Sequence, residues 1–333
     1  ARQAAQVPDT IRFLRFPPTV LIGRHQDLSR EVNLDYCHEN DVGIVSRITG
    51  GGAIYLDEGQ HGWEIVFHRT SLGRPALPDL AREICNAAAA GLTRLGVDAK
   101  FRPRNDIEVD GSKISGTGGF FDGDVLIYQG TVLVDMNPGH MVSALRIPER
   151  KLAKRSLDSA AQRVVTLKEL LGDSLPDLEA IKAALIEGFE SGLGIRASAG
   201  DITDAEEALA RRHLADEIGR DDFVAEINDP AAESDTYSGT YTGSGGTIDA
   251  FVKLEGQGDG TLQRVLFSGD FFVTPPRIVF DLEARLAGTP IEEIDETIDR
   301  FFADNEVGTL SVLPGDFRAA VADALGKREK KHA

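Results

Sequence analysis

The sequence predicts an α+β protein in which helices flank a mixed, largely antiparallel sheet, followed by a small α+β domain at the C-terminus. In the first part of the chain, short apolar segments alternate with Gly and Pro, which is typical of strands joined by turns. After Pro148 the apolar residues follow a helical period instead. A second β-hairpin pattern begins at Thr247, after a polar stretch.

The expected elements of the sheet region follow in chain order. Strand-like segments lie within residues 10–27, 45–57, 61–69 and 105–135. The dipeptides Asp110-Gly111 and Asp122-Gly123 favour hairpin turns inside the last of these segments. Ahead of it, residues 77–96 show the spacing of an amphipathic helix, which ends at a glycine.

The second half of the chain predicts helices and then a separate domain. Helical patterns cover residues 151–171, 175–194 and 203–219, the last with Thr203 as N-cap and Glu206 at the capping-box position. Residues rich in Gly, Ser, Thr and Asp then favour a linker. We expect a β-hairpin and two amphipathic helices after it. The predicted organisation is a first domain over residues 1–228, a linker over 229–246 and a C-terminal domain over 247–333.

Composition narrows the class of protein. The chain has 36 Lys and Arg against 54 Asp and Glu, and its net charge of −18 argues against a nucleic-acid binder, because phosphate contacts need clustered cations. No apolar run approaches the ~20 residues that cross a bilayer, so we expect no membrane association. Two cysteines, Cys37 and Cys85, predict neither a disulfide framework nor a zinc site. We expect a protein of the reducing cytoplasm.

Two stretches carry candidate chemistry. The segment RITGGGAIYLD, residues 47–57, contains three successive glycines, which proteins keep where chain or ligand passes close. By itself it fits a plain loop as well as a phosphate-binding turn. Lys113 lies between Gly111 and Gly116, where its charge could stabilise an oxyanion, although most strand lysines are solvated edge residues. Asn105-Asp106 offers oxygen ligands for Mg²⁺, or starts a turn.

Together, these stretches resemble one family. Residues 47–57, 105–116 and 130–135 are similar in order and spacing to the motifs of lipoate–protein ligases. The resemblance extends upstream to Gly23, Arg24 and Gln26. Downstream it includes Lys151, Ser159, Arg163 and Val164, and the residues after Gly245 resemble the accessory C-terminal domain of this family.

The resemblance implies the fold of biotin and lipoate ligases and a two-step reaction. Lipoate and ATP, with Mg²⁺, would give lipoyl-AMP and pyrophosphate, and the lipoyl group would then pass to a lysine of an acceptor protein. The acceptor would be a lipoyl domain or a protein similar to the glycine-cleavage H protein. We expect the enzyme to act as a monomer. Lys113 would neutralise negative charge in the first step and hold the acyl carbonyl in the second.

The resemblance also implies a set of binding residues. Lys113 is the candidate catalytic residue, and Asn105 and Asp106 are the candidate Mg²⁺ ligands. The candidate substrate- and adenylate-binding residues are Arg47, Thr49, Gly50, Gly51, Gly52, Ala53, Ile54, Asn105, Asp106, Ser115, Gly116, Thr117, Gly130, Thr131, Lys151 and Arg163. The apolar residues Ile54, Ile65 and Val66 fit either a channel for the lipoate tail or ordinary core.

The chain departs from the family pattern at three points. Leu56 and Gln129 stand where many members have histidine, and no arginine follows Gly118-Gly119-Phe120. These departures are compatible with a divergent branch that serves a dedicated lipoate-binding protein. Two alternatives stay open: an octanoyl or lipoyl transferase that uses a cysteine thioester in place of ATP, and a non-catalytic relative that binds lipoate or an adenylate.

Overall fold

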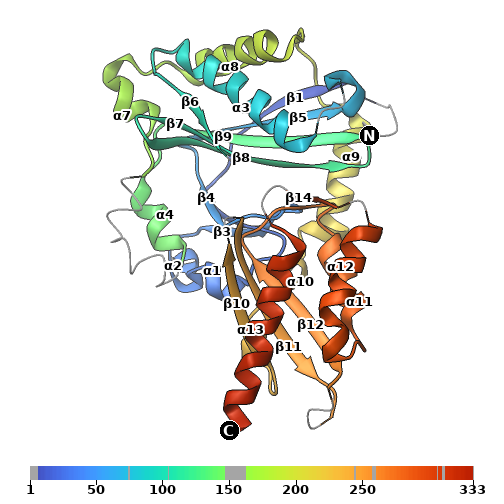
Figure 1. Cartoon of the computed structure of the whole chain (residues 1–333). Coiled ribbons are helices and arrows are strands. Elements are labelled where there is room, and N and C mark those ends of the chain that lie inside the picture. Colours follow the sequence, from blue (N-terminus) through green and yellow to red (C-terminus); the bar gives the residue numbers. More distant parts are fainter. Residues whose placement is uncertain are drawn as a thin grey trace. The chain divides into compact units, whose positions relative to one another are not determined.

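The computed structural model describes residues 7–73, 76–103, 105–146, 163–243, 245–256, 260–305, 307–309 and 312–332. The chain forms two compact units, each made of several segments (Figure 1). The first unit comprises residues 1–20, 33–44 and 54–217. The second comprises residues 21–32, 45–53 and 218–333. Among the described helices, none combines the length and the apolar character needed to cross a bilayer.

The first unit is built on a six-stranded sheet with the strand order β1-β5-β9-β8-β7-β6. Each neighbouring pair in it is antiparallel, which confirms the predicted type of sheet. Asp110 and Gly111 both have positive φ, at 50° and 83°, and they form the predicted turn between β7 and β8. The strands are β1 (Thr10–Leu14), β5 (Gln60–His68), β6 (Lys100–Arg102), β7 (Asp106–Val109), β8 (Ser112–Asp122) and β9 (Val125–Leu133).

Helices α3 and α8 pack against each other beside this sheet (Figure 1). They approach closely because Gly91 and Gly188 lie at the contact, where an added Cβ would come within 2.7 Å and 2.4 Å of backbone atoms of the opposite helix. Phe189 of α8 packs edge-on against Trp63 of β5, with ring centroids 5.1 Å apart. The shorter elements of the unit are α2 (Leu34–Glu39), β4 (Ile54–Leu56), η1 (Arg69–Leu72), α4 (Pro138–Ala144), α7 (Leu167–Leu171), η2 (Gly172–Ser174) and α9 (Asp204–His213), beside α3 (Leu77–Thr93) and α8 (Leu178–Leu193).

The sequence anticipated most of these helices. Helices α3 and α8 lie within the predicted segments, and α9 has the predicted capping box between Thr203 and Glu206. Of the predicted helix over residues 151–171, the structure describes the last part, which contains α7.

Three elements cross a boundary between the units: β2 (Thr19–Ile22), β3 (Gly43–Ser46) and the π-helical η3 (Leu214–Ile218).

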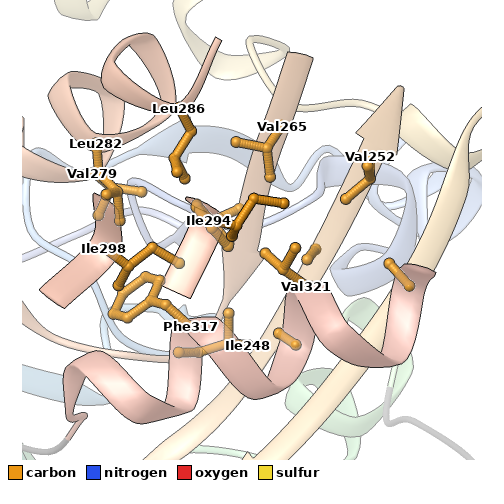
Figure 2. Close-up of a cluster of buried hydrophobic side chains, with 14 of the residues drawn as sticks. Ile248, Val252, Val265, Val279, Leu282, Leu286, Ile294, Ile298, Phe317 and Val321 are labelled. Atoms are coloured by element: carbon orange, nitrogen blue, oxygen red, sulfur yellow. The ribbon is translucent and has the colours of Figure 1, made fainter. Parts of the chain in front are cut away.

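The second unit contains a three-stranded antiparallel sheet, β10-β11-β12, covered by helices. Its hydrophobic core joins Phe317 and Val321 of α13 with Leu282 of α11 and Ile298 of α12 (Figure 2). The predicted hairpin and the two predicted helices are present, and α13 is an additional helix. The elements are α1 (Leu28–Glu31), α10 (Asp221–Val224), η4 (Pro230–Ala232), β10 (Tyr237–Gly243), β11 (Gly246–Leu254), β12 (Leu262–Gly269), β13 (Val273–Thr274), α11 (Ile278–Leu286), η5 (Ile291–Glu293), α12 (Ile294–Asp304), β14 (Gly308–Thr309) and α13 (Pro314–His332).

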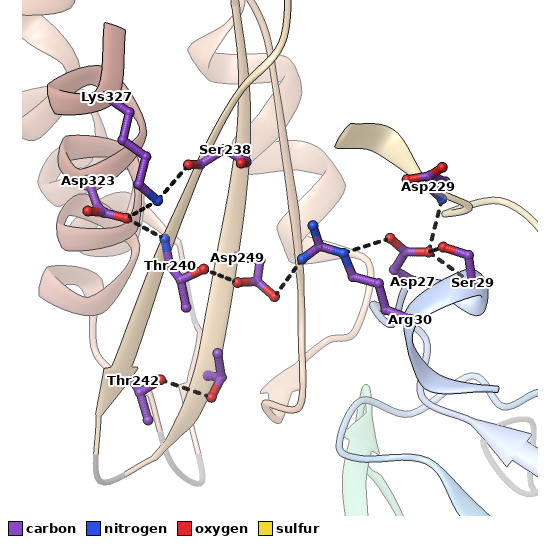
Figure 3. A network of polar contacts seen from close by, with 11 residues as sticks. Asp27, Ser29, Arg30, Asp229, Ser238, Thr240, Thr242, Asp249, Asp323 and Lys327 are labelled. Carbon is purple, nitrogen blue, oxygen red and sulfur yellow. Dashed lines mark hydrogen bonds and ion pairs between the residues drawn. The ribbon is translucent and has the colours of Figure 1, made fainter. Parts of the chain in front are cut away.

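The polar stretch expected as a linker is structured differently. Strand β10 lies inside residues 229–246 and pairs with β11 along its whole length. Its hydroxyl side chains make cross-strand contacts, such as that from Thr240 to Asp249, and its Thr240 amide donates to Asp323 of α13 over 2.9 Å (Figure 3). At the start of the stretch, the Asp229 amide donates to Asp27 over 2.9 Å. The polar residues of this stretch therefore form hydrogen bonds within the second unit. Residues 218–228, which were expected in the first domain, also belong to the second unit.

Candidate functional site

Lys113 lies near the start of β8, with its backbone held from two sides. Its amide donates to the Arg163 carbonyl over 2.7 Å, and its carbonyl accepts from the Val165 amide over 2.9 Å. On the other side, Lys113 pairs with Glu108 of β7, next to an irregularity in the register. The backbone at this position is therefore fixed by both a strand and the segment at Arg163–Val165.

The Lys113 side chain lies across Gly116. Its Nζ is 2.7 Å from Oδ1 of Asp106, the residue that pairs with Gly116 across β7 and β8. A Cβ added to Gly116 would lie 2.7 Å from both Cε and Nζ of Lys113. The Lys113 side chain is 35% exposed, so the ammonium is oriented and still accessible to a ligand.

Asp106 is held by two cations. Its Oδ2 lies 2.7 Å from Nη2 of Arg102, whose Nη1 contacts Glu108 over 3.1 Å. Burial by itself would raise the pKa of Asp106, but Lys113 and then Arg102 outweigh it and hold that pKa below its ordinary value. Asp106 is therefore a carboxylate at neutral pH and keeps the ammonium of Lys113 in place.

Asn105 continues this arrangement along the chain. Its side-chain nitrogen donates to the Thr117 carbonyl, and its own carbonyl accepts from the Thr117 amide over 2.9 Å. Asn105 and Asp106 are the predicted magnesium ligands, but both Asp106 oxygens take charge-assisted bonds from cationic side chains. The described residues contain no cluster of three or more His, Cys, Asp or Glu that could hold a metal. Both carboxylate oxygens of Asp106 are thus engaged by protein cations, and the assignment of Asn105 and Asp106 as magnesium ligands stays a prediction.

Gln129 makes a defined contact in this sheet. It pairs across the strands with Glu64, and its Nε2 donates to Glu64 Oε1 over 2.7 Å. Glu64 also forms an ion pair with Arg12 of β1. By strand alternation, Thr131 lies on the same face of β9 as Gln129. Gln129, Glu64 and Arg12 therefore form a connected polar group on the sheet.

Several predicted site residues pack into the interior of the first unit. Ser115 is fully buried, and Thr117 is 7% exposed. Gly130 lies beneath Trp63, whose ring atom Cζ2 would be 2.2 Å from an added Cβ. Ile65 is also fully buried. Ser115 and Thr117 flank Gly116 along β8, and by strand alternation their side chains lie on the opposite face from it.

The glycine loop belongs to the second unit. Its conformation is set by Arg47, whose guanidinium donates to Thr49 Oγ1 over 3.0 Å and to the carbonyls of Gly50 and Gly52 over 2.8 Å each. Burial lowers the pKa of Arg47 to about 10, below its ordinary value. The Gly51 amide donates to the Phe271 carbonyl over 2.8 Å. In this structure, Arg47 therefore binds carbonyls of its own loop, and a role toward a phosphate stays a prediction.

The predicted site residues divide between the two units. The second unit holds Arg47, Thr49, Gly50, Gly51, Gly52 and Ala53. The first unit holds Ile54, Asn105, Asp106, Lys113, Ser115, Gly116, Thr117, Gly130, Thr131 and Arg163. Lys151 lies outside the described residues. Of the proposed channel walls, Ile54 is 38% exposed and Val66 is half-buried.

Sequence reasoning missed Arg102 and a second group, in which the predicted site residue Thr117 meets Cys85 and Tyr128. Arg102 lies directly opposite Asp106 across the β6–β7 pair. Its position four residues before Asp106, on the other side of a turn, could have indicated this ion pair. The second group is Cys85, Thr117 and Tyr128, which meet from α3, β8 and β9. No sequence pattern joins these three, because they meet only through the packing of α3 on the sheet.

The two cysteines are poorly suited to covalent chemistry. Both are buried, Cys37 at 1% and Cys85 at 0% exposure. Burial raises the pKa of each thiol above its ordinary value. Because the thiolate is the reactive form, neither sulfur has the environment of a nucleophile.

Comparison with known proteins gives a consistent result. Residues 1–190, more than half of the chain, match the family model described as the lipoyl protein ligase A/B catalytic domain. A lipoate-protein ligase of Bacillus subtilis is 32% identical over 158 residues, which are 47% of this chain and 46% of that protein. An octanoyltransferase of Kyrpidia tusciae is 29% identical over 245 residues, which are 65% of this chain and 89% of that protein.

Solved structures agree with the sequence comparison. The chain is similar to a bipartite lipoate protein ligase of Thermoplasma acidophilum, described together with its E2 lipoyl domain, at 26% identity and a TM-score of 0.60. The similarity covers 67% of this chain and 86% of that one. The predicted resemblance and the predicted fold class are both confirmed. The chain spans about half the length of the Bacillus subtilis relative.

Proposed function

Because this chain belongs to the lipoyl protein ligase A/B family, we propose that it is an ATP-dependent lipoate–protein ligase. It would activate lipoate with MgATP and transfer the lipoyl group to a lysine of an acceptor protein. The observation that carries the proposal is the Lys113 ammonium, held 2.7 Å from Asp106 above Gly116 and partly open to solvent. A positive charge fixed in this way suits a reaction between two anions.

In the proposed first step, a carboxylate oxygen of lipoate attacks the α-phosphorus of ATP, and the bond to pyrophosphate breaks. Negative charge accumulates on the phosphoryl oxygens, where the ammonium of Lys113 would stabilise it. In the second step, the neutral amine of the acceptor lysine attacks the acyl carbon, AMP leaves, and the amine loses a proton. The same ammonium would hold the acyl carbonyl oxygen. In both steps Lys113 would act through its positive charge, and Asp106 would keep it oriented.

An octanoyl or lipoyl transferase is the alternative, and it is supported by the similarity to the octanoyltransferase of Kyrpidia tusciae. In the thioester mechanism, a cysteine must accept the acyl group from a carrier. Cys37 and Cys85 are the two cysteines of the chain, and both are buried with raised pKa values. Their environment favours the ligase over the transferase.

The acceptor of the proposed reaction would be a folded lipoyl domain or a protein similar to the glycine-cleavage H protein. The solved relative from Thermoplasma acidophilum is described with its E2 lipoyl domain, which supports this class of partner. We place the reaction in the cytoplasm, consistent with two free cysteines. Magnesium would arrive with ATP as part of the substrate.

The decisive experiment is lipoate-dependent exchange of labelled pyrophosphate into ATP. We expect exchange with the wild type and with a Cys37→Ser/Cys85→Ser double variant, since no thioester is involved. Absence of exchange with lipoate, octanoate and biotin would refute the ligase. Acyl transfer from an octanoyl carrier protein that is lost in the double variant would establish the transferase instead. A protein that binds lipoate but catalyses neither reaction would be a non-catalytic relative.

A further inference from the structure

We propose that Thr117 is a positioning residue for Lys113, which acts by fixing the Asn105-Asp106 segment. This inference rests on the proposed function, because it assigns Thr117 a role in the reaction that Lys113 would catalyse. Thr117 lies in β8, one residue after Gly116, and is 7% exposed. Its side chain belongs to a buried hydrogen-bonded group formed with Tyr128 and Cys85.

Thr117 holds the Asn105 carbonyl with two donors. Its amide donates to that oxygen over 2.9 Å, and its hydroxyl donates to the same oxygen over 2.8 Å. In return, the side-chain nitrogen of Asn105 donates to the Thr117 carbonyl. These contacts fix Asn105, the residue directly before Asp106, and Asp106 is the first residue of β7.

The direction of the buried bonds follows from the number of hydrogens available. A threonine hydroxyl has one hydrogen, and Thr117 gives it to the Asn105 carbonyl. In its 2.7 Å contact with Tyr128 Oη, Thr117 must therefore be the acceptor. Cys85 Sγ lies 3.5 Å from Tyr128 Oη and 3.3 Å from Thr117 Oγ1, and it can donate because burial keeps the thiol protonated. Tyr128 therefore donates to Thr117 and Thr117 donates to Asn105, while Cys85 can donate to either hydroxyl oxygen.

This group links the interior of the first unit to the candidate catalytic lysine. Cys85 comes from α3 and Tyr128 from β9, and both are fully buried. Asn105 leads directly into Asp106, whose carboxylate lies 2.7 Å from the Lys113 ammonium. Positions fixed by rigid core elements are reproduced more accurately than those on free loops. A small shift of Asp106 would move the ammonium, and misplacement by about 1 Å can cost about 100-fold in rate.

Thr117→Val tests the proposal, because it keeps the shape of the side chain but removes the hydroxyl. We expect kcat for lipoate-dependent pyrophosphate exchange to fall by about 10- to 100-fold, with KM for lipoate changed less than threefold. Thr117→Ser keeps the hydroxyl and should restore kcat to within a few-fold of the wild type. Normal kcat in Thr117→Val would overturn the proposal. So would equal losses in the Val and Ser variants, because the missing methyl group would then be responsible.

A second measurement does not depend on activity. Reductive methylation followed by mass spectrometry reports how readily each lysine amine reacts. In Thr117→Val we expect Lys113 to react several-fold faster than in the wild type, because its carboxylate partner is no longer held in place. The internal reference is Lys100 of β6, an exposed lysine that forms an ion pair with Asp98. Unchanged Lys113 reactivity would overturn the inference, whereas a wild type without exchange activity would refute only the proposed function.

Discussion

Lys113 occupies the space that any side chain at Gly116 would need, since an added Cβ would lie 2.7 Å from both Cε and Nζ of the lysine. A strand glycine is usually a weak point, because it packs no side chain. Here its absent side chain gives the ammonium room to reach Asp106. The position of the Lys113 side chain therefore depends on the absence of a side chain at Gly116.

Gly116→Ala should reduce activity far more than stability. The added methyl group displaces the flexible end of Lys113, which can move at little cost in folding free energy. We expect a fall of at least about tenfold in pyrophosphate exchange and a change in unfolding free energy within about 1 kcal/mol. Gly43→Ala is the matched control, because the nearest atom to its added Cβ, Thr19 Oγ1, is 3.4 Å away. Full exchange activity in Gly116→Ala would mean that the observed lysine position is not required.

Lys113→Ala should remove adenylation and leave the fold intact. Loss of a preorganised charge typically costs about 100- to 1,000-fold in kcat. The Lys113–Asp106 ion pair is partly exposed, so its loss should change stability by about 1 kcal/mol or less. Lys100→Ala removes an exposed strand lysine and should leave exchange unchanged. Unfolding of Lys113→Ala, seen by circular dichroism, would identify the lysine as structural.

The three successive glycines should respond differently to substitution. A Cβ on Gly50 would lie 2.2 Å from the Phe271 carbonyl oxygen, and one on Gly51, at φ 91°, would lie 2.2 Å from the Phe272 ring. At Gly52 the nearest atom, in Asp270, is 3.8 Å away. We expect Gly50→Ala and Gly51→Ala to destabilise the protein by about 1–3 kcal/mol, and Gly52→Ala to be nearly neutral.

Gly52→Ala therefore separates packing from binding in this loop. If the loop binds a phosphate through its backbone, Gly52→Ala should weaken ATP binding in calorimetry without a change in melting temperature. Wild-type ATP affinity in this variant would contradict the predicted phosphate-binding role. Equal destabilisation by all three substitutions would contradict the packing described for Gly52.

The second unit contains two groups whose pKa shifts act on stability in opposite directions. Burial, with a smaller contribution from Arg24, lowers the pKa of His25 from 6.5 to about 3. Between these values the unfolded chain binds a proton that the folded chain does not, so stability falls as the pH is lowered. Desolvation raises the pKa of Glu283 from 4.5 to about 8, with Glu226 adding to the shift. The folded chain then holds the extra proton, and stability falls as the pH rises from 4.5 to 8.

Each contribution has a maximal slope of about 1.4 kcal/mol per pH unit. Urea unfolding at pH 4, 5.5 and 8 measures the effect. Relative to the wild type, Glu283→Gln should lose less stability between pH 5.5 and 8, and His25→Leu should lose less between pH 5.5 and 4. Parallel pH profiles for wild type and variants would show that these two groups are not responsible.

Local patterns in the sequence predicted much of the fold and the centre of the candidate site. Residues 77–96 show a helical period and residues 61–69 read as a strand, so α3 and β5 were predictable. The spacing of the motifs that contain Gly51, Asp106 and Lys113 indicated the family, and the match over residues 1–190 confirmed it. These features are local, because each depends on residues that are neighbours in the chain.

Only the tertiary structure decided what surrounds those residues. It placed Cys85 beside Thr117 and Tyr128, and it placed Phe272 where a side chain on Gly51 would lie. It also brought polar residues expected in a linker into strand β10. Sequence spacing cannot give these contacts, because they depend on how distant segments pack and on which side chain fills the space left by a glycine. The sequence therefore determined the type of protein and its candidate catalytic lysine, and packing determined how that lysine is held.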